Sequence, residues 1–267
     1  MDLFSKFDEH IDYKKSEKLY WIPNDTEELF LNNLKKYSDS NHLISYKENP
    51  ITYELNNYGF RTPDDFYDGD EGTVYLGCSH TFGIAHYLEN VWSYKLHKKI
   101  GKGKFFNLSR GATGLYSQYY FLKYFSTKLK INKVFHFYPK ESNFRYGFMD
   151  KDEKIRVIGH FAEDSKNKLD EDIWKQYLIH DSYNKFHNSV FKDAIKNICN
   201  EIGCEYLLNE DSQIVWVKND SNQYVGTLDP YNKKMTPARD LLHYYVEKQH
   251  DIYNNFLKIS EYKNDII

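Results

Sequence analysis

The chain has 267 residues, of which 40% are hydrophobic and 28% charged, and its formal net charge is −3. This composition is typical of a globular protein with a sizeable core. The interleaved charges, without a long basic run, argue against a nucleic-acid partner. No apolar stretch has the length of a membrane span or the pattern of a signal peptide, so we expect no membrane partner.

The three cysteines lack the spacing of a disulfide framework. Such cysteine usage is typical of a reducing compartment, so we expect a cytoplasmic protein. A virion component made in a host cytoplasm would have the same composition.

Residues 1–70 are expected to form an N-terminal extension packed on the core, ahead of the main domain over 71–267. Within the extension, Asp25 followed by Glu28 predicts a helix N-cap with a capping box, because an apolar helical pattern comes directly after them. Proline, asparagine and glycine then mark turns up to the start of the second segment.

Apolar strand patterns alternate with helical patterns from residue 73 onward. The strands are expected at 73–77, 104–108, 133–138 and 205–208, with a short strand or hairpin edge at 155–158. A long helical pattern ends at Gly203, a typical C-cap residue, and a last helix is expected over about 241–259. The alternation predicts an α/β fold, a three-layer α/β/α sandwich around a parallel, flavodoxin-like sheet.

Reactive groups in such sheets collect at the carboxyl ends of the strands. Ser79 follows the first strand, within Gly77-Cys-Ser-His-Thr-Phe-Gly83. A tight strand-to-helix turn between glycines would present the hydroxyl together with nearby backbone N–H groups. Ser79 would equally serve as an ordinary helix N-cap, and the segment alone leaves both interpretations open. Cys78 is expected to be a buried strand-end residue, and His80 to be exposed on the first helical turn.

Asp240 and His243 come shortly before or within the last helical pattern. Their spacing allows both side chains to point the same way from a turn. A serine hydroxyl needs a base to take its proton, and the base works better when a carboxylate fixes its tautomer. Taken separately, Asp240 could be a helix cap and His243 a half-buried helical residue. His250, about two turns further along, is an alternative base, whereas His136 has the mid-strand position of a packed core histidine.

Together these segments resemble the SGNH/GDSL hydrolase family over about residues 53–256. Gly77-Cys-Ser79 is similar to the Gly-Asp-Ser triplet of the first block, and Asn107-Leu-Ser-Arg-Gly111 resembles the second block. Asp240-Leu-Leu-His243 matches the Asp-x-x-His of the last block. Two further strings are similar to one branch of the family, namely Tyr53-Glu-Leu-Asn-Asn-Tyr-Gly-Phe-Arg61, in the lead-in, and Ala238-Arg-Asp240.

The resemblance implies an ester hydrolase in which Ser79 attacks the carbonyl, His243 transfers the proton and Asp240 orients the imidazole. It also implies that backbone N–H groups of Ser79 and Gly111 hold the oxyanion. The family's habits suggest a small O-acyl group, such as acetyl on a carbohydrate or a similar polar molecule. This mechanism needs no cofactor, and the sequence has no metal-ligand or phosphate-loop spacing.

The third block of the family, Gly-x-Asn-Asp, is missing from this chain. After Tyr138 the sequence continues Pro-Lys-Glu-Ser-Asn-Phe-Arg, so Asn143 is a candidate oxyanion donor and Arg145 a candidate contact for an anionic substrate group. An ordinary surface loop explains this segment equally well. The departure keeps two alternatives open, namely a weakly active or inactive module of the same fold and an O-acyltransferase. The oligomeric state is left open.

Overall fold

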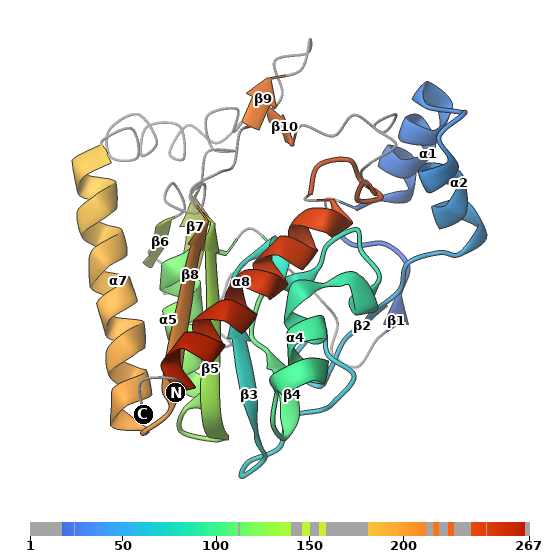
Figure 1. Ribbon diagram of the computed structural model, residues 1–267. Coiled ribbons are helices and arrows are strands. Elements are labelled where there is room, and N and C mark those ends of the chain that lie inside the picture. Colours follow the sequence, from blue (N-terminus) through green and yellow to red (C-terminus); the bar gives the residue numbers. More distant parts are fainter. Residues whose placement is uncertain are drawn as a thin grey trace.

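The computed structural model describes residues 18–23, 25–111, 113–139, 146–149, 155–158, 181–211, 216–218, 224–226, 236–243 and 245–264. Its centre is a four-stranded parallel sheet (Figure 1). The strands are β3 (Glu71–Leu76), β4 (Lys104–Asn107), β5 (Lys130–Pro139) and β8 (Glu205–Asp211). Their order, β4-β3-β5-β8, places the first strand between the second and the third, as in flavodoxin-like sheets. The predicted α/β fold is confirmed.

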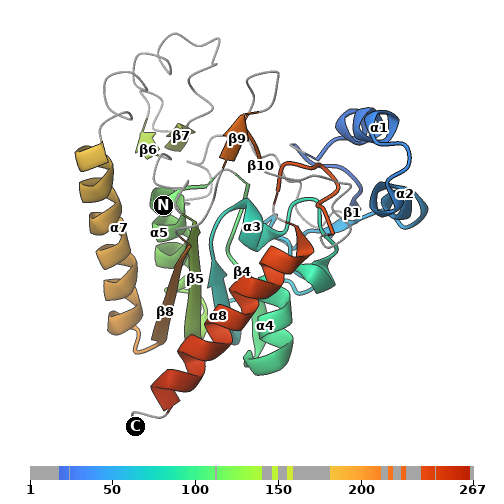
Figure 2. The ribbon, with the colours of Figure 1, turned by 45° about the horizontal axis from the view of Figure 1, so that its top comes forward.

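Helices cover both faces of this sheet (Figures 1 and 2). One face carries α5 (Leu115–Phe125) and α7 (Asp181–Glu201), and the other carries α4 (Trp92–Ile100) and α8 (Val246–Asn264). The stacked rings of Trp92 and Phe256, with centroids 4.7 Å apart, join α4 to α8.

Side chains of β3 alternate between two buried clusters, because successive residues of a strand point to opposite faces. Val74 and Leu76 pack in the cluster beneath α5 and α7, whereas Tyr75 packs in the cluster beneath α4 and α8. Each such buried side chain contributes roughly 1.5–3 kcal/mol through removal of apolar surface from water. A strand buried on both faces therefore has the nearly continuous apolar sequence from which it was predicted.

Smaller elements lie outside the sheet. Two helices precede it, α1 (Glu27–Lys36) and α2 (Asn41–Glu48). Three antiparallel pairs are formed by β1 (Lys18–Leu19) with β2 (Tyr53–Glu54), β6 (Tyr146–Met149) with β7 (Ile155–Ile158), and β9 (Trp216–Lys218) with β10 (Tyr224–Gly226). The single turn α3 (Ser79–Phe82) and the 3₁₀ turn η3 (Leu88–Asn90) connect β3 to α4.

Two predicted helix starts are wrong. The N-cap of α1 is Thr26, whose Oγ1 accepts a hydrogen bond of 3.2 Å from the N–H of Leu29, so Asp25 is not the cap. The last helix begins at Val246 and not near residue 241, which leaves 236–243 as an irregular turn. Gly203, just after α7, has the left-handed φ of 70° expected of a C-cap glycine.

None of the helices within the described ranges combines the length and the apolar character that crossing a membrane requires.

Candidate active site

Ser79 begins α3 directly beyond the carboxyl end of β3 (Figure 2). Gly77 is needed there, because a Cβ at this position would lie 1.9 Å from Oγ1 of Thr81. The turn ends at Gly83, whose φ is 81° and whose N–H donates to the carbonyl of Ser79 over 2.8 Å. The N-cap position is occupied by Cys78, which is buried as predicted, so the N-cap interpretation of Ser79 is wrong.

The guanidinium of Arg61 fixes the segment that follows this turn. It donates to the backbone carbonyls of Gly83, of His86 over 2.8 Å and of Thr52 over 3.0 Å. Burial lowers the pKa of Arg61 to about 10, so the side chain remains protonated at neutral pH. A permanent buried cation that binds several carbonyls holds the backbone around α3 in one conformation. Sequence reasoning assigned no role to Arg61; its only signal was the family-like string that ends on it.

Gly111 lies buried in the loop that follows β4. In the same loop, Oγ1 of Thr113 donates to the carbonyl of Gly77 over 3.1 Å and to that of Arg110 over 2.9 Å. The loop therefore lies against the residue that opens the Ser79 turn. The N–H groups of Ser79 and Gly111 have no hydrogen-bond acceptor within the part of the chain that the structure describes.

Asp240 and His243 form a close pair on the turn before α8. Nδ1 of His243 lies 2.5 Å from Oδ2 of Asp240, and Oδ1 of Asp240 accepts from the N–H groups of Leu242 (3.0 Å) and His243 (3.2 Å). Burial alone would raise the pKa of Asp240, but the charge of His243 and these hydrogen bonds lower it below its usual value. Because the carboxylate faces Nδ1, Nε2 is the nitrogen left to exchange a proton with a substrate or nucleophile.

The turn that carries His243 lies against the turn that carries Ser79. The rings of His243 and His80 meet edge to face with centroids 5.5 Å apart, and Nε2 of Gln249 donates to the carbonyl of His80 over 3.2 Å. His80 is buried, contrary to the expected exposure, because its ring packs between these segments. Among the described residues, no hydrogen bond joins the hydroxyl of Ser79 to His243. Such bonds often tighten only in complexes with substrate.

The remaining candidates divide into three groups. Asn143 and Arg145 lie outside the described residues. His250 is exposed on α8, where its ring stacks on that of Tyr253, and no contact links it to Ser79 among the residues described. His136 is buried in the middle of β5, as predicted.

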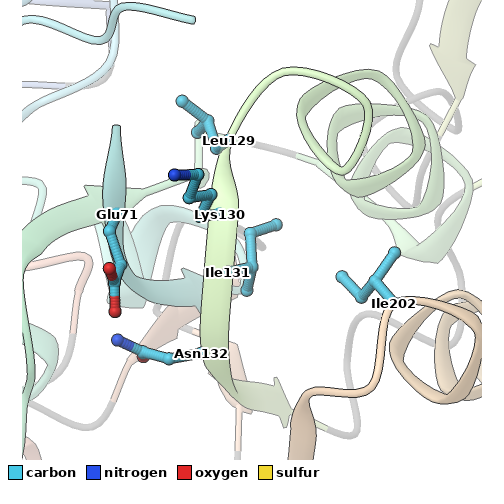
Figure 3. A pocket seen from close by; sticks show the side chains of 6 residues that line it. All are labelled: Glu71, Leu129, Lys130, Ile131, Asn132 and Ile202. Atoms are coloured by element: carbon cyan, nitrogen blue, oxygen red, sulfur yellow. The ribbon is translucent and has the colours of Figure 1, made fainter. Parts of the chain in front are cut away.

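A cavity of about 370 Å³ lies where β3 and β5 begin (Figure 3). It is lined by Glu71, Leu129, Lys130, Ile131, Asn132 and Ile202. Glu71 and Lys130 are the first residues of β3 and β5, whereas Ser79 lies beyond the last residue of β3. Its lining holds no serine, threonine, cysteine or histidine, so it offers neither the nucleophile nor the base of a serine hydrolase.

No group of three or more His, Cys, Asp or Glu side chains in the described ranges is arranged to hold a metal ion. Comparison of the sequence with protein-family models gives no match, and comparison with curated proteins gives none either.

Proposed function

We propose that the chain is a serine ester hydrolase of the SGNH/GDSL type. The observation that carries the proposal is the Asp240–His243 pair. Nδ1 of His243 lies 2.5 Å from Oδ2 of Asp240, and Asp240 is buried. The imidazole of this pair contacts the ring of His80, the next residue after Ser79. A hydroxyl at the carboxyl end of a parallel strand and a carboxylate-oriented imidazole on a neighbouring turn are two of the groups that acyl transfer to serine requires.

In the proposed reaction, Nε2 of His243 accepts the hydroxyl proton while Oγ of Ser79 bonds to the ester carbonyl. Backbone N–H groups of Ser79 and Gly111 hold the resulting oxyanion. The carbon–oxygen bond to the alcohol then breaks, and the proton on His243 passes to the leaving alkoxide. Water, activated by the same imidazole, attacks the acyl-serine, which releases the carboxylic acid and restores Ser79.

The proposed substrate is a small O-acyl ester, such as an acetyl group on a carbohydrate or similar polar molecule. Asn143 would supply a further oxyanion donor and Arg145 would contact an anionic substrate group. The reaction as proposed uses no cofactor and no nucleic-acid partner, and we place it in a reducing compartment such as the cytoplasm.

Hydrolysis of p-nitrophenyl acetate tests the proposal. Ser79→Ala and His243→Ala are each expected to lower kcat/KM by at least about a thousandfold, because a triad acts as a unit. A fluorophosphonate should label Ser79, as located by mass spectrometry. The matched controls Ser126→Ala, at a half-buried serine at the end of α5, and His250→Ala, at an exposed histidine, should keep the wild-type rate. Equal rates in Ser79→Ala and wild type would contradict the proposal.

A second candidate is a binding module that retains the fold without turnover. It is favoured by the missing third block and by the lack of a Ser79–His243 hydrogen bond among the described residues. This candidate predicts neither hydrolysis nor fluorophosphonate labelling. Acyl transfer is distinguished by product analysis with a competing sugar acceptor, since a transferase forms the acylated sugar and a hydrolase releases free acid.

A further inference from the structure

A buried ion pair links the described residues within 18–70, called the N-terminal segment below, to the turn that carries Asp240. Nε of Arg239 lies 3.1 Å from Oδ1 of Asp25, and Nη2 lies 2.5 Å from Oδ2. Both residues are excluded from solvent, at 0% exposure. Sequence reasoning took Asp25 for a helix cap; its carboxylate instead serves a residue 214 positions further along the chain.

Aromatic and backbone groups complete the surroundings of this pair. Nη2 of Arg239 also donates to the carbonyl of Tyr20 over 2.7 Å, and its guanidinium lies 4.0 Å from the ring centroid of Trp21. The hydroxyl of Tyr53 donates to the Asp25 carboxylate. Every one of these partners precedes β3, so the N-terminal segment binds the guanidinium of Arg239.

The same network reaches the segment after Ser79. The N–H of Ala85 donates to the hydroxyl of Tyr53 over 2.8 Å, and the carbonyl of Ala85 accepts from the N–H of Arg239 over 3.0 Å. Ala85 therefore connects Tyr53, the partner of Asp25, with the backbone next to Asp240. The two turns of the candidate active site share this support.

The turn itself has a conformation that needs external support. Leu241, directly after Asp240, has a left-handed φ of 56°, which costs free energy for a residue with a side chain. Its side chain packs among buried residues of the N-terminal segment. Two further hydrogen bonds come from α1 and α2, namely Nδ2 of Asn33 to the carbonyl of Asp240 (3.2 Å) and the hydroxyl of Tyr46 to that of Pro237 (2.7 Å). Figures 1 and 2 both show this loop beside the N-terminal helices.

Stability alone is a poor explanation for such a pair. Two charges lose their hydration on burial, and apolar replacements of similar volume are often equally or more stable. Burial raises the pKa of Asp25, which the charge and hydrogen bonds of Arg239 only partly oppose. Because burying these two charges costs free energy, the pair is better explained by the single position in which it holds the backbone of Arg239.

We propose that Asp25 and Arg239 are positioning residues, and that the N-terminal segment holds the Asp240–His243 pair in its working geometry through them. This inference rests on the proposed function. Arg239 precedes Asp240 directly, so a shift of its backbone moves the carboxylate that orients the imidazole. A misplacement of about 1 Å in a catalytic group can lower the rate about a hundredfold.

Asp25→Asn tests the inference, because it removes the charge and keeps the shape. We expect kcat per active site to fall about 10- to 100-fold, with KM changed less than about twofold. Active sites are counted by fluorophosphonate titration, so loss of folded protein does not lower the measured kcat. Asp25→Glu, which keeps the charge, should recover part of the loss. Tyr53→Phe removes one hydroxyl from the network and gives the same test, with a smaller decrease, if Asp25→Asn does not fold.

The matched control is Thr73→Val, near the opposite end of β3. Oγ1 of Thr73 is hydrogen-bonded to Asn132 over 2.9 Å, so this variant also loses a buried polar contact. A general loss of stability would lower the unfolding temperature of both proteins and leave kcat per site unchanged in both. An unchanged kcat per site in Asp25→Asn would overturn the inference while the hydrolase proposal stood.

A second measurement does not depend on activity. The Nδ1 proton of His243, held by Asp240, should give a low-field ¹H NMR signal that is absent in His243→Gln. We expect this signal to shift or broaden in Asp25→Asn and to persist in Thr73→Val. If the wild type shows the signal but neither turnover nor labelling, the proposed function fails while the positioning of the pair can still be judged. A signal identical in wild type and Asp25→Asn would then refute the inference that Asp25 positions the Asp240–His243 pair.

Discussion

His136 should make the stability of this protein depend on pH between about 6.5 and 3. Its ring lies fully buried in β5, with Nε2 2.6 Å from Oε1 of Gln118 and Nδ1 2.7 Å from the hydroxyl of Tyr206. Burial, assisted by the charge of Lys192, lowers its pKa from 6.5 to about 3. The neutral ring matches both partners, since Nε2–H donates to Gln118 and Nδ1 accepts from Tyr206.

The sign of the effect follows from proton binding. Above about pH 6.5 the residue is neutral in both states, so its contribution to stability is fully present. As the pH falls, the unfolded chain binds a proton that the folded chain does not bind until about pH 3. Each pH unit in this range lowers the free energy of unfolding by about 1.4 kcal/mol, which gives a loss of about 2 kcal/mol at pH 5.

Urea unfolding followed by tryptophan fluorescence at pH 7, 6 and 5 measures this dependence. His136→Gln cannot titrate, so its free energy of unfolding should fall by about 2 kcal/mol less than that of the wild type between pH 7 and pH 5. At pH 7 the variant is expected to be less stable by about 1–3 kcal/mol, because its buried partners are imperfectly matched. His250→Gln, the same change at an exposed histidine, should retain the wild-type pH dependence. Parallel pH profiles for wild type and His136→Gln would refute the argument.

Two further predictions concern the site. Gly77→Ala would force a Cβ to within 1.9 Å of Oγ1 of Thr81, so we expect a destabilisation of about 1–3 kcal/mol in urea unfolding. Thr81→Ala should restore part of that loss in the double variant, and strictly additive effects would argue against the contact. Asp240→Asn should lower kcat about 10³- to 10⁴-fold, because the amide no longer selects the required tautomer of His243. A kcat within tenfold of wild type would exclude Asp240 from the mechanism.

The central sheet could be predicted because its strands are buried on both faces. The apolar run Thr73-Val-Tyr-Leu-Gly77 ends at a glycine, and the observed strand spans Glu71–Leu76. Helix starts were less predictable, since Asp25 and Thr26 are adjacent and both residue types cap helices. Asp25 binds Arg239 instead of capping the helix, and no local sequence pattern connects these two residues.

The pairing within the site was partly visible in the sequence. Asp240 and His243 are three residues apart, so a single turn brings their side chains together wherever that turn lies. The approach of His243 to His80 depends instead on how α8 packs against α4, which is a property of the whole fold. The role of Arg61 was hidden for the same reason, because its partners are backbone carbonyls, and any residue type supplies those.

These differences share one physical cause. Sequence patterns show which side chains are apolar. Because the burial of apolar surface is non-directional, it determines the packing of sheets and helices into layers better than the conformation of individual turns. The geometry of the turn before α8 depends on directed contacts between groups distant in the chain, here Asp25 with Arg239 and Tyr53 with Ala85. Without these partners, the turn at Leu241 would lose several of the contacts that support its left-handed conformation. Under the proposed function, the segment before β3 therefore supports the candidate site together with the three quoted blocks.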